Sequence, residues 1–164
     1  MDALERLVAI QEIRDQIARY AIWFDDKEWE SFATLWADDA VFEVNDLVFD
    51  GKAAVLDFLV NCLPDDYSGK HMNATPLVEP DVAGDRARAR TDVVWISQDF
   101  ENRIVARYDD EFVRSDGRWL LRRRSEVVVP FTPGAPPMSA TAMEASSPTM
   151  RPSETTKSRA EKLA

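Results

Sequence analysis

The sequence predicts an α+β fold, in which helices come first and a curved antiparallel sheet follows them. In residues 4–25 apolar side chains recur at steps of three and four, which is typical of an amphipathic helix. From His71 onward the apolar period changes to two, which is typical of strands, and short turns separate the strand candidates. This order differs from the alternating βαβ order of a parallel sheet, and a chain of 164 residues fits one domain.

Three helices are predicted in the first part of the chain. The first covers residues 4–25, and its inward face consists of apolar and aromatic residues: Ile10, Ile13, Ile17, Tyr20, Ala21 and Phe24. A second helix is predicted to begin after Asp25, because Asp25 and Glu28 have the spacing of a capping box. It continues over residues 29–36, and a third helix is predicted over residues 52–62.

Short strands follow wherever apolar and polar residues alternate between turn residues. They are predicted at residues 41–44, 47–49, 71–79, 86–97, 103–114 and 118–129. Pro76 lacks a backbone donor, so the strand over residues 71–79 is expected to be imperfect. In residues 86–97 the alanine, threonine, valine and tryptophan side chains alternate with arginine and aspartate, which predicts one buried and one solvated face.

Composition excludes several classes of function. Acids outnumber bases by 30 to 20, and a formal charge of −10 argues against nonspecific binding to nucleic acid or to an anionic membrane. No apolar run approaches the roughly 20 residues of a membrane span, and the acidic N-terminus is unlike a signal peptide. A single cysteine, Cys62, excludes an internal disulfide, so a cytoplasmic location is expected. One histidine among scattered acids predicts no metal site, and no cofactor is expected.

The composition changes near the C-terminus, which suggests a domain boundary. Residues 1–132 are predicted to form the folded domain, and residues 133–164 are rich in proline, serine, threonine, alanine and methionine without periodicity. Such a composition is typical of a flexible tail. The alternative is that residues 130–133 and the segment after them pack on a neighbouring subunit.

Several short motifs are distributed from the first helix to the last strand. They are Arg19-Tyr20, Leu35-Trp36-Ala37-Asp38-Asp39-Ala40-Val41-Phe42, Gly51 before a helix, Tyr108-Asp109-Asp110-Glu111-Phe112 and Asp116-Gly117-Arg118-Trp119. With these motifs residues 4–132 resemble the SnoaL-like branch of the nuclear transport factor 2-like superfamily. The resemblance implies a cone-shaped α+β barrel, with N-terminal helices packed into a strongly curved antiparallel sheet. It also implies a homo-oligomer, a trimer or a dimer, and the apolar residues Val94, Ile96 and Val127 to Val129 are the expected interface.

Within this family the chain is most similar to the group of scytalone dehydratase, bile-acid 7α-dehydratase and hexachlorocyclohexane dehydrochlorinase. That group pairs an aspartate late in the first helix with a histidine on the first long strand, and these positions fall on Asp25 and His71. The resemblance places Tyr20 five residues before the aspartate and Arg124 five after a tryptophan on the last strand. Scytalone dehydratase uses a second histidine, which this chain lacks; Asp92 lies near that place.

These residues suggest a lyase of the dehydratase or dehydrohalogenase type, or an isomerase, that acts on a hydrophobic small molecule without a cofactor. His71 would remove a proton from carbon, and Asp25 would orient the imidazole and stabilise the imidazolium. Tyr20 would donate a proton and Arg124 would hold developing negative charge. A set of three further residues is predicted to bind the substrate: Trp23, Phe42 and Asp92.

Each of these residues also has a simpler interpretation. Asp25 is placed to cap a helix, His71 follows a polar loop and could be exposed, and aromatic residues usually belong to the core. Asp92 is placed to pair with Arg90 or with an arginine across the sheet. Two further functions follow from these interpretations, a pocket that binds without catalysis and a module that assembles through its sheet. The distance between the Asp25 carboxylate and the His71 ring is the observation that best separates them.

Overall fold

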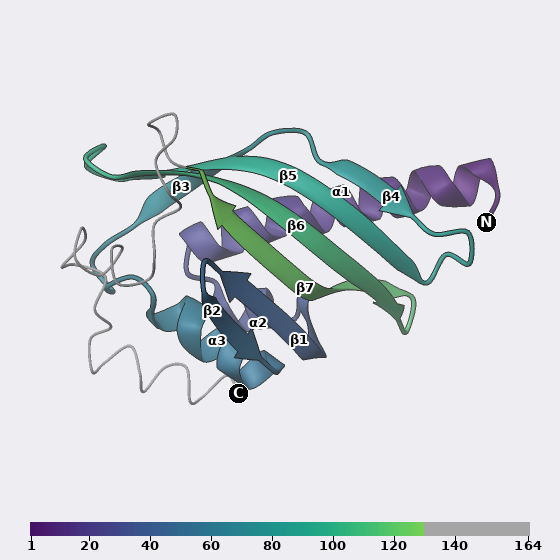
Figure 1. The fold of residues 1–164 in the computed structure, drawn as a ribbon, viewed down its shortest axis with the longest axis horizontal. Coiled ribbons are helices and arrows are strands. Elements are labelled where there is room, and N and C mark those ends of the chain that lie inside the picture. The colour runs from purple at the N-terminus through teal and green to yellow at the C-terminus, as the bar shows by residue number, and fades with distance from the viewer. Residues whose placement is uncertain (130–164) are drawn as a thin grey trace.

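The fold is an α+β cone in which a long helix lies along one face of a curved sheet (Figure 1). The computed structural model describes residues 1–129, so the predicted boundary at residue 132 and the tail over residues 133–164 lie outside the described residues. The first helix, α1, spans Ala3–Asp25, as predicted. Two shorter helices follow, α2 (Trp29–Ala33) and α3 (Lys52–Asn61). None of the helices within residues 1–129 is long and apolar enough to cross a membrane.

Seven strands form one sheet. They are β1 (Trp36–Val44), β2 (Leu47–Asp50), β3 (Gly69–Asn73), β4 (Leu77–Pro80), β5 (Arg86–Ser97), β6 (Arg103–Ser115) and β7 (Arg118–Val128). The strand order is β2-β1-β7-β6-β5-β3, and β4 also pairs with β5. The sheet stays open, since β2 and β3 at its two ends do not pair with each other.

One strand pair corrects the prediction of a purely antiparallel sheet. β1 and β7 run parallel, with Phe42 beside Arg124 and Val44 beside Glu126, whereas all other pairs are antiparallel. A parallel pair needs a long connection, and here the connection consists of most of the chain. As a result the first and last strands meet in the middle of the sheet.

The capping box predicted between Asp25 and Glu28 is wrong. The capping box of the structure lies instead at the start of α1, where Asp2 and Glu5 exchange side-chain to backbone hydrogen bonds. Glu28 is the N-cap of α2 and makes no side-chain cap there. The second helix is also shorter than predicted, because the Leu35 carbonyl accepts a hydrogen bond from the Leu121 amide at 2.8 Å, which commits the chain to the sheet.

The imperfect strand predicted over residues 71–79 is two strands, β3 and β4, with Pro76 between them. Both pair with β5: His71 faces Trp95, and Val78 faces Ala89. Because of this break, the long strand β5 pairs with both short strands. As a result β3 reaches the C-terminal end of α1. The alternating faces predicted for residues 86–97 are confirmed by the burial of β5.

The core lies between α1 and the concave face of the sheet. Ile13 of α1 and Phe32 of α2 are 0% exposed, and Trp36 and Trp119 are 1% exposed. On the outer face Val127 and Val129 remain 50% and 43% exposed. Both residues belong to the apolar set that was expected to form a subunit interface. The homo-oligomer stays a prediction.

The packing of α1 can be tested with two substitutions on the same helix. Replacing Ile13, which is fully buried, with alanine is expected to lower the free energy of unfolding by about 2–5 kcal/mol, because it leaves a cavity. The control Leu7→Ala, at a position 65% exposed, is expected to change it by about 0.5 kcal/mol or less. Urea denaturation measures both values, and equal losses would contradict the packing described above.

Candidate active site

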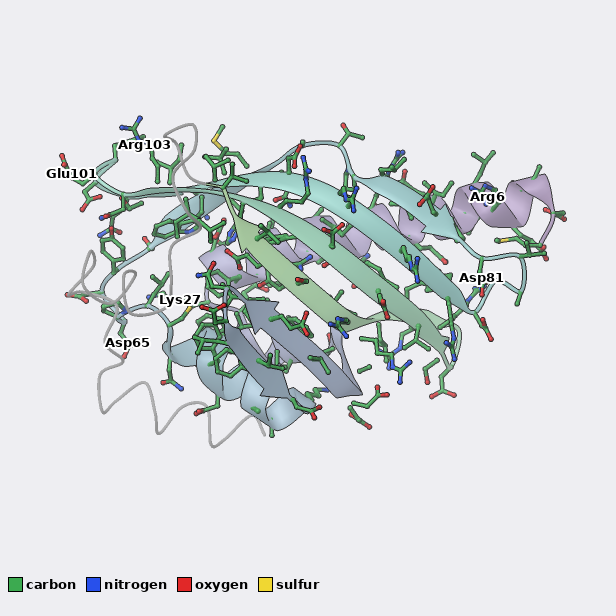
Figure 2. All side chains as sticks on the ribbon, viewed as in Figure 1. Arg6, Lys27, Asp65, Asp81, Glu101 and Arg103 are labelled. Atoms are coloured by element: carbon green, nitrogen blue, oxygen red, sulfur yellow. The ribbon has the colours of Figure 1, made fainter. Side chains whose placement is uncertain are left out.

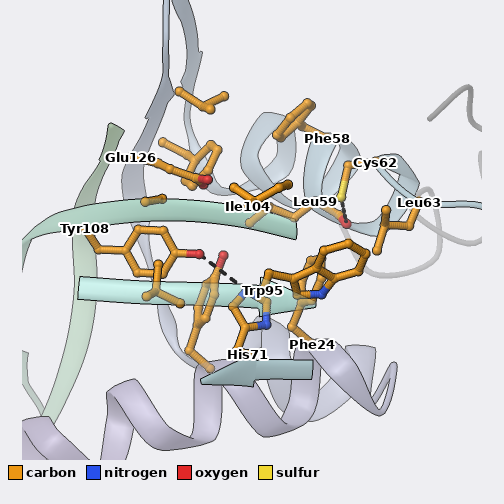
Figure 3. Close-up of a pocket in the computed structure, with 15 residues that line it drawn as sticks. Phe24, Phe58, Leu59, Cys62, Leu63, His71, Trp95, Ile104, Tyr108 and Glu126 are labelled. Atoms are coloured by element: carbon orange, nitrogen blue, oxygen red, sulfur yellow. Dashed lines mark hydrogen bonds between the residues drawn. The ribbon is translucent and has the colours of Figure 1, made fainter. Parts of the chain in front are cut away.

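An apolar cavity of about 110 Å³ opens between the C-terminal part of α1, helix α3 and the concave face of the sheet (Figure 3). Aromatic and aliphatic side chains make up most of its wall, including Phe24, Phe42, Phe58, Leu59 and Trp95. The polar groups that reach it are few: His71, Tyr20, Tyr108, Cys62 and Glu126. An apolar cavity with a small number of polar groups is the usual form of a site for a small molecule.

Asp25 and His71 meet at the wall of this cavity. The Nδ1 atom of His71 lies 2.6 Å from Oδ1 of Asp25, and the His71 backbone amide donates to Oδ2 of Asp25 at 2.7 Å. The His71 and Asp25 side chains are only 7% and 3% exposed. The carboxylate therefore fixes both the ring and the strand that carries it, and the predicted contact between the two residues is present.

Three elements bring this pair together. Asp25 is the last residue of α1, and His71 lies in the middle of β3. The third element is β5, which carries Trp95. Gly69 lies on β3, two residues before His71, and a Cβ atom at this position would overlap the indole ring of Trp95. A glycine at this position lets β3 pair closely with β5 while Trp95 fills the cavity wall.

The hydrogen bonds around His71 define its tautomer. Because Nδ1 faces a carboxylate, it carries the proton, and Nε2 is left as an acceptor. The Tyr108 hydroxyl lies 3.3 Å from Nε2. Burial raises the pKa of Tyr108 well above its ordinary value, so this hydroxyl keeps its proton and donates. The ring of His71 also meets the ring of Phe24 edge to face, with centroids 5.4 Å apart.

Arg124 occupies a different place from the predicted one. Its guanidinium is fully buried and makes a bidentate ion pair with Asp110, with Nε–Oδ1 and Nη2–Oδ2 distances of 2.7 Å. It lies between the rings of Tyr20 and Tyr108, at 3.9 and 4.1 Å from their centroids. Arg124 does not line the cavity, which corrects the prediction that it holds charge on the substrate. It supports two tyrosines that do line it, through cation–π contacts.

The other predicted site residues divide into two groups. Tyr20 and Phe42 line the cavity. Trp23 is half-buried against the core but is not part of the cavity wall. Asp92 lies on the outer face of β5 and accepts a hydrogen bond from Arg107 of β6 at 2.7 Å. The prediction that Trp23 and Asp92 bind substrate is therefore wrong, and Asp92 makes the cross-strand pair that was its simpler interpretation.

Glu126 is the residue that the sequence interpretation missed. It lies on β7 directly across from Tyr108, and its carboxyl enters the cavity. Burial in apolar surroundings raises the pKa of the Glu126 carboxyl to about 7, although the Arg124 charge opposes this increase. The spacing of two between Arg124 and Glu126 was the available signal, since such residues share one face of a strand.

The remaining polar group of the wall is the Cys62 thiol. Burial raises the pKa of the Cys62 thiol to about 12, and its Sγ lies 3.1 Å from the Leu59 carbonyl oxygen. A thiol with so high a pKa is a poor nucleophile near neutral pH. Within the described part of the chain, no three histidine, cysteine, aspartate or glutamate residues are grouped as metal ligands.

Comparison with known proteins places the chain among similar folds and sequences. A sequence model of the SnoaL-like domain matches residues 5–125. Hexachlorocyclohexane dehydrochlorinase 1 of Sphingobium indicum is 28% identical over 138 residues, which cover 81% of this chain and 90% of that protein. Gamma-hexachlorocyclohexane dehydrochlorinase of the same species is 27% identical, over 81% of this chain and 88% of that protein.

Two solved structures show the same fold. A candidate scytalone dehydratase from Novosphingobium aromaticivorans superimposes with a TM-score of 0.68 and 20% identity, over 79% of this chain and 89% of that one. The LinA-type3 hexachlorocyclohexane dehydrochlorinase from Novosphingobium barchaimii gives a TM-score of 0.65 and 23% identity, over 85% and 96% of the two chains.

The support beneath the cavity can be tested at two neighbouring aspartates. Replacing Asp110 with asparagine leaves the buried Arg124 guanidinium without its charged partner, and the free energy of unfolding is expected to fall by about 3–5 kcal/mol. The control Asp109→Asn removes an exposed pair with Arg90, and a loss of about 1 kcal/mol or less is expected. Chemical denaturation measures both losses, and a small effect of Asp110→Asn would mean that Arg124 finds another acceptor.

Proposed function

The chain belongs to the SnoaL-like domain family, and from this premise we propose that it is a cofactor-independent lyase acting on a hydrophobic small molecule. The single observation that carries the proposal is the Asp25–His71 pair. One carboxylate accepts hydrogen bonds from both the ring and the backbone of His71, at the wall of an apolar cavity. This is the arrangement that a general base with a fixed tautomer requires.

His71 would remove a proton from carbon through Nε2. As the imidazole takes up the proton it becomes a cation, and the Asp25 carboxylate at 2.6 Å from Nδ1 stabilises that cation. The side chains around the pair exclude water, which strengthens this interaction. An entering substrate would replace the 3.3 Å contact between Tyr108 and Nε2, and the Tyr108 hydroxyl would then be free to donate to the substrate.

The kind of reaction is supported by the relatives. The two similar Sphingobium proteins are named as dehydrochlorinases, and dehydrochlorination is an elimination that begins at a carbon-bound proton. The same proton abstraction would serve an isomerase, but the names of these relatives favour elimination. A pocket that only binds would have no need of a buried carboxylate behind its histidine, because burying a charge costs free energy.

The size of the cavity limits the substrate. A volume of about 110 Å³ is somewhat smaller than the apolar cavity of about 150 Å³ that holds a benzene molecule in a well-studied protein. We therefore propose a substrate with a single six-membered ring, bound with a small outward shift of the wall.

The proposal predicts a loss of proton abstraction when either member of the pair is changed. The test uses exchange of the α-hydrogens of cyclohexanone in D₂O, followed by NMR. His71→Ala and Asp25→Asn are each expected to lower the protein-catalysed exchange by at least about 100-fold, because a positioned base contributes that much or more. The double variant is expected to be little worse than either single one, since the two residues act as one unit.

A matched control lies one residue away. Asp26 also forms an ion pair, with Lys70, but its side chain is 46% exposed. Asp26→Asn is therefore expected to keep the full exchange rate, and near-ultraviolet circular dichroism checks that each variant is folded. If the folded His71→Ala and Asp25→Asn variants catalysed exchange at nearly the wild-type rate, the pair would not be the base.

A further inference from the structure

Glu126 is the one carboxyl group among the described residues that line the cavity. It extends from β7, whereas Tyr108 extends from β6 and His71 from β3, so that the three groups enter from different strands (Figure 3). Its strand neighbours in register are Tyr108 and Val44. Within residues 1–129 no hydrogen bond or ion pair fixes the Glu126 carboxyl, whereas five other acids of the sheet are paired with arginines. The Glu126 carboxyl is therefore free to form hydrogen bonds with a molecule in the cavity.

The groups that face Glu126 favour its neutral form. Arg124 is the one cation beside it, and that guanidinium is already paired with Asp110. The titratable groups around it are Tyr20, Tyr108 and Cys62, and burial raises the pKa of each of them, so all three remain protonated and neutral. His71 lies on the same cavity and is bound to Asp25. The cavity thus presents the Glu126 carboxyl, with its raised pKa, and the His71 imidazole to a bound molecule.

We propose that Glu126 is the general acid of the elimination, and that the leaving group it protonates is a hydroxyl on a ring ketone. This inference rests on the proposed function of His71. His71 Nε2 takes the proton from the carbon next to the carbonyl, and that electron pair forms the carbon–carbon double bond. The carbon–oxygen bond breaks, and the oxygen takes the Glu126 proton and leaves as water. One proton then returns from the imidazolium to the Glu126 carboxylate through solvent, which restores the site.

The choice of hydroxyl over halide follows from the charges at the cavity. Hydroxide is a poor leaving group and needs a proton, which a neutral carboxylic acid supplies. Chloride is a weak base that leaves without a proton, so a carboxylic acid brings it no advantage, whereas a positive charge would stabilise the departing anion. Among the described residues that line the cavity none carries a fixed positive charge, because Arg124 is held behind Tyr20 and Tyr108 by Asp110. The chain is therefore equipped for dehydration of a single-ring hydroxy ketone.

The test compares two substrates that differ only in the leaving group. Wild-type protein, Glu126→Gln and His71→Ala are given 3-hydroxycyclohexanone and 3-chlorocyclohexanone, and formation of cyclohexenone is followed by ultraviolet absorbance after subtraction of the rate in buffer. In Glu126→Gln the ratio of hydroxyl to chloride elimination is expected to fall by at least about 30-fold, because only the hydroxyl needs the proton. The matched control Glu111→Gln, on the exposed face of the same sheet, is expected to leave the ratio unchanged.

The dependence on pH gives a second readout. Hydroxyl elimination by wild-type protein is expected to fall as the pH rises above about 7, where Glu126 loses its proton. The folded protein also binds this proton more tightly than the unfolded chain, whose glutamate pKa is about 4.5. Wild-type protein should therefore lose thermal stability relative to Glu126→Gln as the pH rises from about 5 to about 8. Thermal unfolding at several pH values measures this difference without any substrate.

The outcomes separate this inference from the proposed function. If His71→Ala abolishes both eliminations while Glu126→Gln lowers both equally, the role of Glu126 is wrong and the role of His71 stands. If His71→Ala keeps both activities, the proposed function fails. If wild-type protein accelerates neither elimination, or only that of chloride, the hydroxy ketone is not its substrate and the inference is overturned.

Discussion

The Asp25 carboxylate is the group on which the geometry of the site depends. It stands at the last residue of α1 and accepts two hydrogen bonds from His71, one from the ring and one from the backbone. A carboxylate that is only 3% exposed is stable there because both of its oxygens have partners. The same two bonds join the helix to β3, so that the position of the strand and the orientation of the imidazole are fixed together. The packing of α1 and the geometry of the candidate site are in this way one constraint.

A second buried ion pair, between Arg124 and Asp110, supports two tyrosines of the cavity wall. Arg124 and Asp110 satisfy each other through two hydrogen bonds, and the guanidinium fills the space between the rings of Tyr20 and Tyr108. Removing the pair from water costs free energy, which the bidentate geometry and the two ring contacts offset. The tyrosines are held firmly as a result, and both hydroxyl-bearing rings line the cavity.

The two charged pairs leave the cavity with a distinct chemical character. The carboxylate of Asp25 and the ion pair of Arg124 with Asp110 lie outside the cavity space. The polar groups that line it are the His71 imidazole, the Tyr20 and Tyr108 hydroxyls, the Cys62 thiol and the Glu126 carboxyl. Burial separates the properties of two carboxylates in the same site: Asp25 is bonded on both oxygens, whereas Glu126 has apolar neighbours and a pKa of about 7. Two carboxylates with different environments and different roles are a recurring feature of acid–base sites.

The sequence by itself determined the fold class, nearly all of the helices and strands, and the Asp25–His71 contact. Periodicity is a local property, which is why it predicts helices and strands. The pairing of Asp25 with His71 came from the resemblance to the dehydratase group, since the chain has 30 acidic residues and only one histidine. What only the tertiary structure decided begins with an irregularity in β7. Glu111 pairs with Arg123, and Phe112 pairs with Leu121, so that Arg122 is an extra residue in the strand. Such a bulge exchanges the two faces of a strand. Trp119 and Leu121 are both buried, and a strict period of two counted from them would place Arg124 and Glu126 on the outer face of the sheet. The bulge turns them inward, and no local pattern in the sequence could show it, because its position depends on the pairing of β7 with β6 and β1.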